Sequence, residues 1–273
     1  MQAPDTPAPS REEDRKLMLD AVREAGGLAL GFYRTDLKKW MKSGDSVVTE
    51  ADIAVNDLLQ ERLAGARPDY GWLSEETGDD PVRLKRARVW VVDPIDGTRA
   101  FAKGKPHFVL SVALVEDGAP VLGVLFNPAT GEFFEAEAGA GARLNGAAIS
   151  VNDRTEIAHC RMAAHGPMFR HPAWPEPWPE MEFIERNSVA YRIALVACGV
   201  ADAALALTAK NDWDLAAADL ILHEAGGRLT THEGKKLVYN RELPRHRSLV
   251  AAGPRLHDAL LARVDRLTLP SSA

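Results

Sequence analysis

Val89-Trp90-Val91-Val92 runs directly into Asp93-Pro94-Ile95-Asp96-Gly97-Thr98. The first four residues form a short, continuous apolar run, which is typical of a β-strand that is covered on both faces. Two carboxylates three residues apart follow this run, and at a strand end they can share one or two hard cations. Gly97 permits a tight turn, and Thr98 is expected to begin a helix whose free amide groups favour phosphate. This stretch therefore predicts a buried strand that ends in a metal and phosphate site.

Two helices are expected on the N-terminal side of this strand, because two capping boxes precede apolar residues at helical spacing. Ser10 and Glu13 form the first box, and Thr49 and Asp52 form the second. The glycines at 26 and 27 could end the first helix, or the helix could continue to Tyr33. A polar loop at 42–46 lies between the two helices.

Shorter elements are expected after the buried strand. Apolar segments at 108–115 and 120–126 flank Glu116-Asp117-Gly118-Ala119, and this arrangement predicts a β-hairpin. The next strand is expected at 132–136. The glycine-rich segment 139–146 is expected to be a loop.

The second half of the chain again mixes helices and strands. A surface loop rich in proline and tryptophan is expected at 171–180, and Gly226-Gly227 closes a helix at 215–225. Strands are expected at 229–231 and 248–252, and a final helix at 256–267. These alternations favour layers of α and β structure, with an α+β half followed by an α/β half. The predicted organisation is a disordered tail at 1–10, an N-terminal α+β subdomain at 11–148 with most metal ligands, and a C-terminal α/β subdomain at 149–273.

Composition limits the classes of function. The 273 residues are 46% hydrophobic and 26% charged, as in an ordinary globular protein. The net charge of −6 argues against a nucleic-acid polymer as partner, because binding a phosphate backbone needs a concentrated basic surface. A small phosphorylated metabolite is compatible with this charge if metal ions supply positive charge at the site.

Cellular location is indicated by the cysteines and by the absence of sorting signals. Cys160 and Cys198 fit neither a disulfide framework nor a zinc site, so reduced thiols and a cytoplasmic location are expected. The first ten residues have neither a basic head nor an apolar run, unlike a secretory signal. The longest apolar stretch, at 191–209, is interrupted by Arg192, Gly199 and Asp202, whereas a bilayer span needs about 20 apolar residues. No membrane span is expected.

Four stretches together resemble the inositol monophosphatase superfamily. Asp93–Thr98 is similar to its metal-binding signature, and Ser74-Glu75-Glu76 to its upstream acidic motif. The segment Asp45–Asp52 resembles its N-terminal aspartate motif, and Trp213–Ala217 through Gly226-Gly227 resembles its C-terminal signature. The resemblance covers nearly the whole chain. It implies the layered αβαβα sandwich of the inositol monophosphatase and fructose-1,6-bisphosphatase type, a Mg²⁺-dependent phosphomonoester hydrolase, sensitivity to lithium, and a homodimer.

The same resemblance implies a role for each motif residue. Glu75, Asp93, the Ile95 carbonyl and Thr98 would surround a first Mg²⁺ ion. Asp93, Asp96 and Asp214 would surround a second, and a third, weaker ion would lie near Glu75. A water molecule oriented by Thr98 and Asp52 would attack phosphorus, which agrees with metal-assisted in-line displacement. The catalytic residues would be Thr98, Asp52 and Glu75, and the substrate would contact Gly97, Thr98, Lys210 and Arg186.

Several of these residues have structural alternatives. Asp214 lies at a helix start, where aspartate is a common N-cap, and Asp52 belongs to its own capping box. Glu76 is interpreted either as a residue that supports the metal ligands without binding the ion or as a solvated side chain. Lys42 is interpreted as a solvated side chain. His107 receives no role.

The substrate is less clearly indicated than the chemistry. Inositol phosphatases commonly carry an acidic residue where this chain has Leu207, and Lys210 lies nearer to Asp214. A lysine in place of a carboxylate favours a substrate with additional negative charge. Adenosine 3',5'-bisphosphate, the substrate of related bisphosphate nucleotidases, is therefore expected first, and inositol 1-phosphate second. Histidinol phosphate is the third candidate, because Arg99-Ala100-Phe101 resembles variants found in histidinol phosphatases.

Two classes of function other than an enzyme are disfavoured. A non-enzymatic sensor of phosphorylated metabolites would not need every expected metal carboxylate together with Thr98. A structural or interaction protein is suggested only by the loop Trp174–Trp178, and such loops more often border a pocket or a subunit contact.

Overall fold

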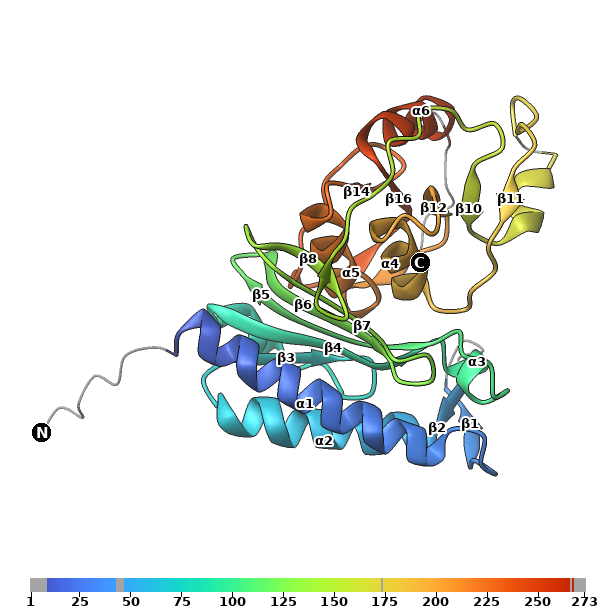
Figure 1. Cartoon of the computed structure of the whole chain (residues 1–273). Helices are drawn as coiled ribbons and strands as arrows, with labels where there is room; N and C mark the ends of the chain where they lie inside the picture. The colour runs from blue at the N-terminus through green and yellow to red at the C-terminus, as the bar shows by residue number, and fades with distance from the viewer. Residues whose placement is uncertain (1–8, 43–46, 173, 266, 268–273) are drawn as a thin grey trace, which may run out of the picture.

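The computed structural model describes residues 9–42, 47–172, 174–265 and 267. Most of the predicted tail at 1–10 and of the polar loop at 42–46, including Asp45 and Ser46, lies outside these residues. Helices and sheets alternate in the order α, β, α, β, α (Figure 1), which confirms the predicted sandwich. In the described residues, no helix is both long and apolar enough to cross a bilayer.

The first layer consists of α1 (Arg11–Phe32) and α2 (Glu50–Ala66). Both predicted capping boxes form, with Glu13 and Asp52 at the third helical position. Helix α1 continues past the glycines at 26 and 27, so the alternative of an early stop is wrong. Gly26 faces the sheet so closely that a Cβ there would lie 2.2 Å from the Phe126 ring, which makes this glycine a packing residue.

The first sheet contains seven strands in the order β3-β4-β5-β6-β7-β8-β9. Strand β3 pairs parallel with β4, and the remaining neighbours pair antiparallel. The predicted hairpin is β5–β6, with positive φ at Asp117 and Gly118. The strands are β3 (Gly71–Ser74), β4 (Arg88–Asp96), β5 (Val109–Glu116), β6 (Ala119–Asn127), β7 (Glu132–Glu137), β8 (Gly141–Leu144) and β9 (Ala147–Ala148).

Strand β8 corrects the expectation of a loop at 139–146. Its residues have weak strand propensity, but β7 offers them a free edge, and Ala142 pairs with Ala136 while Leu144 pairs with Phe134. The strand thus depends on a neighbour in the sheet rather than on a local pattern.

The remaining layers come from the second half of the chain. Helices α4 (Val189–Ala197) and α5 (Asp212–Glu224) lie between the two sheets, and α6 (Pro254–Val264) covers the outer face of the second sheet (Figure 1). The second sheet has the order β11-β10-β12-β16-β14. Its strands are β10 (Arg161–Ala163), β11 (Glu182–Phe183), β12 (Ala203–Ala206), β14 (Arg228–Thr230) and β16 (Leu249–Ala252).

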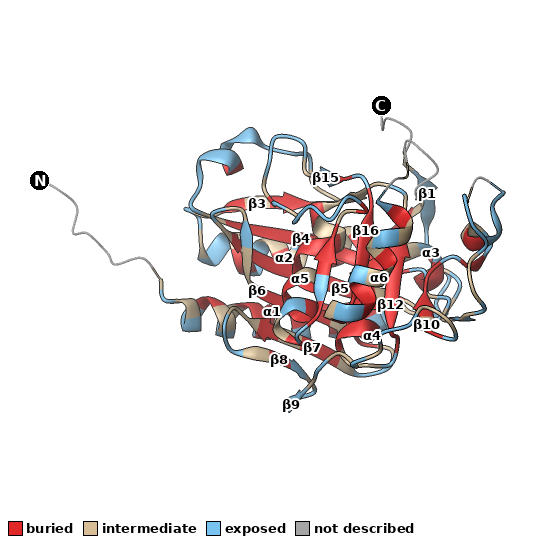
Figure 2. Cartoon of the chain, turned by 90° about the horizontal axis from the view of Figure 1, so that it is seen from above, coloured by how far each residue is buried: buried red, intermediate tan, exposed pale blue. Residues whose placement is uncertain are grey.

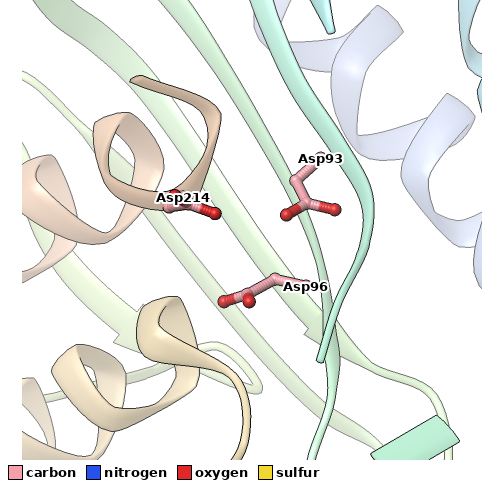
Figure 3. Close-up of side chains that lie close together, drawn as sticks. All are labelled: Asp93, Asp96 and Asp214. Carbon is pink, nitrogen blue, oxygen red and sulfur yellow. The ribbon is translucent and has the colours of Figure 1, made fainter. Parts of the chain in front are cut away.

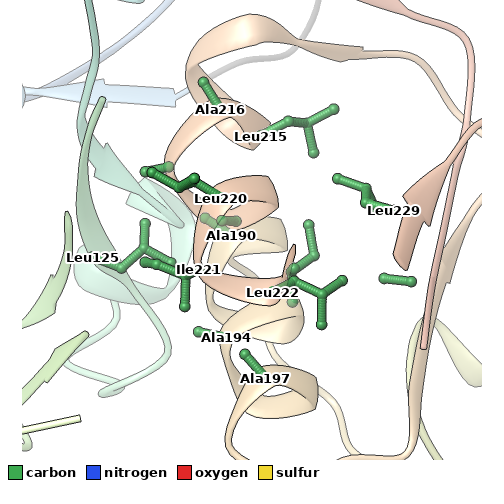
Figure 4. Packing of buried hydrophobic residues seen from close by; sticks show 14 of the residues in the cluster. Leu125, Ala190, Ala194, Ala197, Leu215, Ala216, Leu220, Ile221, Leu222 and Leu229 are labelled. Carbon is green, nitrogen blue, oxygen red and sulfur yellow. The ribbon is translucent and has the colours of Figure 1, made fainter. Parts of the chain in front are cut away.

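The buried residues are concentrated in the sheets and in the helix faces that pack on them (Figure 2). The largest cluster joins α4 and α5 to both sheets; Leu125 of β6, Ile221 of α5 and Leu229 of β14 belong to it (Figure 4). The division at 148/149 therefore crosses a shared core, and two subdomains remain a proposal. The tryptophan-rich loop packs its rings on Phe169, with Trp178 edge-on at 4.9 Å.

Candidate active site

The end of β4 carries Asp93 and Asp96, and the strand continues through both of them. In a regular strand, side chains three residues apart point to opposite faces. Here the pairing with β5 shifts between them, since Asp93 lies opposite Ser111 and Asp96 opposite Val109. Such a bulge inserts an extra residue and changes the direction of a side chain. It explains how these two carboxylates reach one centre.

Asp214 reaches the same centre from the first turn of α5. It is the third helical residue, not the N-cap; Asn211 is the N-cap, and its amide donates to Oδ2 of Asp214 at 2.7 Å. One carboxylate oxygen from each of Asp93, Asp96 and Asp214 lies within 4.8 Å of the others. The three side chains project into the space between β4 and α5 (Figure 3). Close carboxylate oxygens of this kind, two from β4 and one from α5, fit a hard divalent cation.

Helix α4 holds Asp96 in place. Ser188 Oγ and the Ala190 amide donate to Oδ2 of Asp96 at 2.6 and 2.7 Å, so this carboxylate caps the first turn of α4. Asp93 accepts a hydrogen bond from the Ile95 amide at 3.0 Å. Each carboxylate of the centre is therefore oriented by a backbone amide.

Glu75 lies beside this centre because β3 runs parallel to β4. Its amide donates to the Val92 carbonyl at 3.2 Å, which places Glu75 next to Asp93. Lys42 was expected to be solvated, but its Nζ lies 2.5 Å from Oε1 of Glu76 and 3.8 Å from Oε1 of Glu75. The side chain of Glu76 is only 3% exposed, which excludes the solvated alternative. No local pattern predicted this ion pair, since Lys42 and Glu76 meet only after folding.

Thr98 and Asp52 form a hydrogen-bonded pair, as the predicted catalytic roles require. Thr98 begins the short helix α3 (Thr98–Phe101), and its Oγ1 lies 2.9 Å from Oδ1 of Asp52 and 3.0 Å from the Ile95 carbonyl. The other oxygen of Asp52 accepts from the amide and hydroxyl of Thr49. Burial raises the pKa of Asp52 to about 6, although these hydrogen bonds oppose the shift.

The carboxylates raise one another's pKa values. Burial, followed by the charge of Asp214, raises the pKa of Glu75 to about 8. Burial and the charge of Asp96 raise the pKa of Asp214 to about 7. The pKa values of Asp93 and Asp96 are raised too, first by burial. Such crowding of desolvated negative charge is relieved by a bound cation, so the donor set fits a metal centre.

Comparisons with known proteins agree with this geometry. The model of the inositol monophosphatase family matches residues 10–269. The chain belongs to this family. Members of the family are phosphatases, and this chain is accordingly a phosphomonoester hydrolase of a metal-dependent family.

Individual relatives cover nearly the whole chain. A histidinol-phosphatase of Chlorobaculum parvum is 32% identical and aligns over 92% of this chain and 96% of its own length. An inositol-1-monophosphatase of Caulobacter vibrioides is also 32% identical, over 90% of this chain and 99% of its own. The solved structure of a Thermotoga maritima IMPase is 29% identical, with a TM-score of 0.79, over 92% of this chain and 96% of that one.

Two of the predicted substrate contacts, Gly97 and Lys210, lie beside the carboxylate centre of this family member. Gly97 has φ +101°, and a Cβ there would lie 2.7 Å from the His107 carbonyl, so only glycine fits. Lys210 is half-buried, and its Nζ donates to Thr208 Oγ1 at 3.1 Å and to the Ala209 carbonyl at 3.3 Å, while its charge lowers the pKa values of Asp96 and Asp214. His107, which received no role from the sequence, supports Gly97 and accepts a hydrogen bond from the Ser188 amide at 3.3 Å.

Removing the Thr98 hydroxyl is expected to lower the catalytic rate of this phosphatase while the protein remains folded. Thr98→Ala should lower kcat by ~10²–10⁴, the range for losing a positioned proton-transfer group. Thr98→Ser is the matched control, because it keeps the hydroxyl bonded to Asp52 and should retain most activity. Steady-state kinetics with a phosphomonoester would measure both variants. Equal losses in the two would show that the methyl group, not the hydroxyl, matters.

Proposed function

We propose that this chain is a Mg²⁺-dependent phosphomonoesterase with Asp93, Asp96 and Asp214 as metal ligands. The convergence of their oxygens within 4.8 Å supports this role. Glu75, which lies next to Asp93, and the Ile95 carbonyl, which accepts a hydrogen bond from Thr98, complete the proposed donor set. Bound divalent cations lower the pKa of water and stabilise negative charge on the attacking and leaving oxygens.

The protein's own residues position and deprotonate the attacking water in this proposal. Thr98 Oγ1 orients the water, and Asp52 accepts a proton through the Thr98 hydroxyl. Asp52 is suited to this task because it is buried and its Oδ1 already accepts the hydrogen bond of the Thr98 hydroxyl. Gly97 lets the backbone of His107 and Ser188 approach the turn that precedes Thr98, and this packing helps to hold Thr98 in place.

A small basic hollow next to Asp96 supports a substrate with a second anionic group. Its volume is about 160 Å³, and Arg192, whose charge lowers the pKa of Asp96, connects it to the carboxylate centre. Arg186 Nε is buried and, within the described part of the chain, lacks a hydrogen-bond partner. A buried donor without an acceptor is costly, and an anionic ligand would satisfy it. The basic side chains of the hollow are Lys105, His107, His165, Arg186 and Arg192, with Glu185 as its carboxylate.

Adenosine 3',5'-bisphosphate is the substrate that we propose first. Its second phosphate could bind Arg186 or Lys210 while the 3'-phosphate is hydrolysed. Leu207, at the position of the acidic residue of inositol phosphatases, packs against the core of the second sheet and α6 and offers no acceptor for ring hydroxyls. Guanidinium groups pair well with phosphate oxygens.

Two other substrates are favoured by the names of relatives. Proteins 32% identical to this chain are named inositol-1-monophosphatase and histidinol-phosphatase. Histidinol phosphate carries an amine, which Lys105, Arg186 and Arg192 would repel. Inositol 1-phosphate, which is neutral apart from its phosphate, is therefore the second candidate.

A substrate panel tests this order. Adenosine 3',5'-bisphosphate should exceed inositol 1-phosphate and histidinol phosphate in kcat/KM by about tenfold to hundredfold, the value of one charge-assisted contact of about 1.5–3 kcal/mol. Lys210→Ala and Arg186→Ala should each remove much of this preference and leave inositol 1-phosphate nearly unaffected. Arg143→Ala, an exposed arginine on β8, is the control. Equal efficiency on all three substrates, or a preference unchanged by both substitutions, would overturn the nucleotidase proposal but not the phosphatase activity.

A further inference from the structure

A second basic hollow lies on the surface formed by residues 231–247. Its volume is about 550 Å³, within the usual range for small-molecule sites of about 300–1,000 Å³. One carboxylate, Glu233, lines it, and this residue pairs with Lys235 at 2.6 Å. The chain as a whole carries a net charge of −6, so this local excess of positive charge runs against its composition. The cationic side chains of the hollow are Lys235, Lys236, Arg241, Arg245 and Arg247.

The hollow adjoins the depression that contains Glu75, because Leu243 and Arg245 line both, but it does not include the clustered aspartates. None of Asp93, Asp96 and Asp214 lines it, and β15 (Arg245–His246) forms part of its wall. Strand β15 pairs antiparallel with β13 (Lys210–Asn211).

The buried histidines at the floor of the hollow have hydrogen-bond partners inside the protein. His246 Nε2 lies 2.8 Å from Oδ1 of Asp212, and His232 Nδ1 lies 2.7 Å from Ser248 Oγ, all four residues being buried. These groups have partners inside the protein, so they shape the hollow. A ligand would instead meet the exposed cations around its rim.

Apolar side chains stand beside the cations. Leu243 is 69% exposed and Val238 50% exposed, and both line the hollow. Exposed apolar side chains next to a cluster of lysines and arginines suit a molecule with a flat apolar ring and several phosphate oxygens.

We propose that this hollow is a second binding site, for a nucleoside diphosphate or triphosphate. The rim cations would bind the phosphates, and Leu243 and Val238 would contact the base. The site uses none of the proposed metal ligands, so it goes beyond the proposed hydrolytic function and does not depend on the substrate of the enzyme. A nucleic-acid polymer fits less well, because its phosphate backbone needs an extended basic surface rather than one hollow.

ADP binding to the full chain in the presence of Mg²⁺ tests the proposal by isothermal titration calorimetry. Lys236→Gln/Arg241→Gln removes two exposed rim cations and should weaken ADP binding by at least about tenfold, since each charged hydrogen bond contributes that much. Lys16→Gln/Arg143→Gln removes two exposed charges on other surfaces and should leave the affinity unchanged. Asp214→Asn should also leave it unchanged, and adenosine, which lacks phosphates, should bind much more weakly than ADP.

Several outcomes would overturn this site. Unchanged ADP affinity in the rim variant, Lys236→Gln/Arg241→Gln, would refute the proposed site. Equal weakening of ADP binding in both double variants would show only an effect of net charge. Loss of binding in Asp214→Asn would place ADP in the carboxylate centre. A single-stranded oligonucleotide that binds more tightly than ADP and depends on the same rim cations would identify a polymer site instead. If the rim variant retains its phosphatase activity, each of these results concerns the second binding site alone and leaves the proposed hydrolytic function unaffected.

Discussion

Replacing Asp214 with asparagine is expected to lower kcat by about 10³-fold while the protein still unfolds cooperatively. A lost metal ligand removes several kcal/mol of transition-state stabilisation, and about 1.4 kcal/mol corresponds to a factor of ten. The fold should persist because an asparagine oxygen can still accept the Asn211 amide that caps α5. Steady-state kinetics and urea unfolding would measure the two effects.

Asp219 offers a matched control on the same helix. Burial raises its pKa to about 6, and it accepts a hydrogen bond from the Tyr239 hydroxyl at 2.8 Å, away from the carboxylate cluster. Asp219→Asn should keep most of the wild-type kcat. A similar loss of activity in both variants, or near wild-type activity in Asp214→Asn, would contradict the assignment of Asp214 to a metal.

Removing divalent cations is expected to abolish activity and to make stability strongly dependent on pH. The pKa of Asp214 rises on folding from 3.8 to about 7, so the folded metal-free protein binds more protons than the unfolded chain between these values. Its free energy of unfolding should therefore fall as pH rises from about 4 to about 7. The raised pKa of Glu75, about 8, extends the loss toward pH 8.

Urea unfolding in excess chelator at pH 5 and pH 8 would measure this loss. Mg²⁺ should restore both activity and stability at pH 8, because a cation replaces the protons among the carboxylates. Ca²⁺ should restore stability but oppose activity, since it accepts longer bonds and more ligands than Mg²⁺. Full activity in excess chelator would refute the metal mechanism, and stability that rises between pH 5 and pH 8 would refute the electrostatic account.

Local sequence patterns determined much of the framework of this protein. The capping boxes at Ser10 and Thr49 predicted the starts of α1 and α2, and the apolar run at 89–92 predicted the buried strand β4. These features depend on hydrogen bonds and side-chain spacing within a few residues, so the sequence alone contains them. The residues of the motif at 93–98 are contiguous, so the sequence alone also contains this motif, which indicated a family of phosphatases.

Only the tertiary structure decided how the site is assembled. The bulge that brings Asp93 and Asp96 to one centre arises from the pairing of β4 with β5. The arrival of Asp214 depends on α5 packing between the two sheets. The ion pair of Lys42 with Glu76 likewise joins side chains that have no short-range relation. Contacts between layers are set by the burial of apolar faces across the whole chain, and no local pattern of residues records that packing.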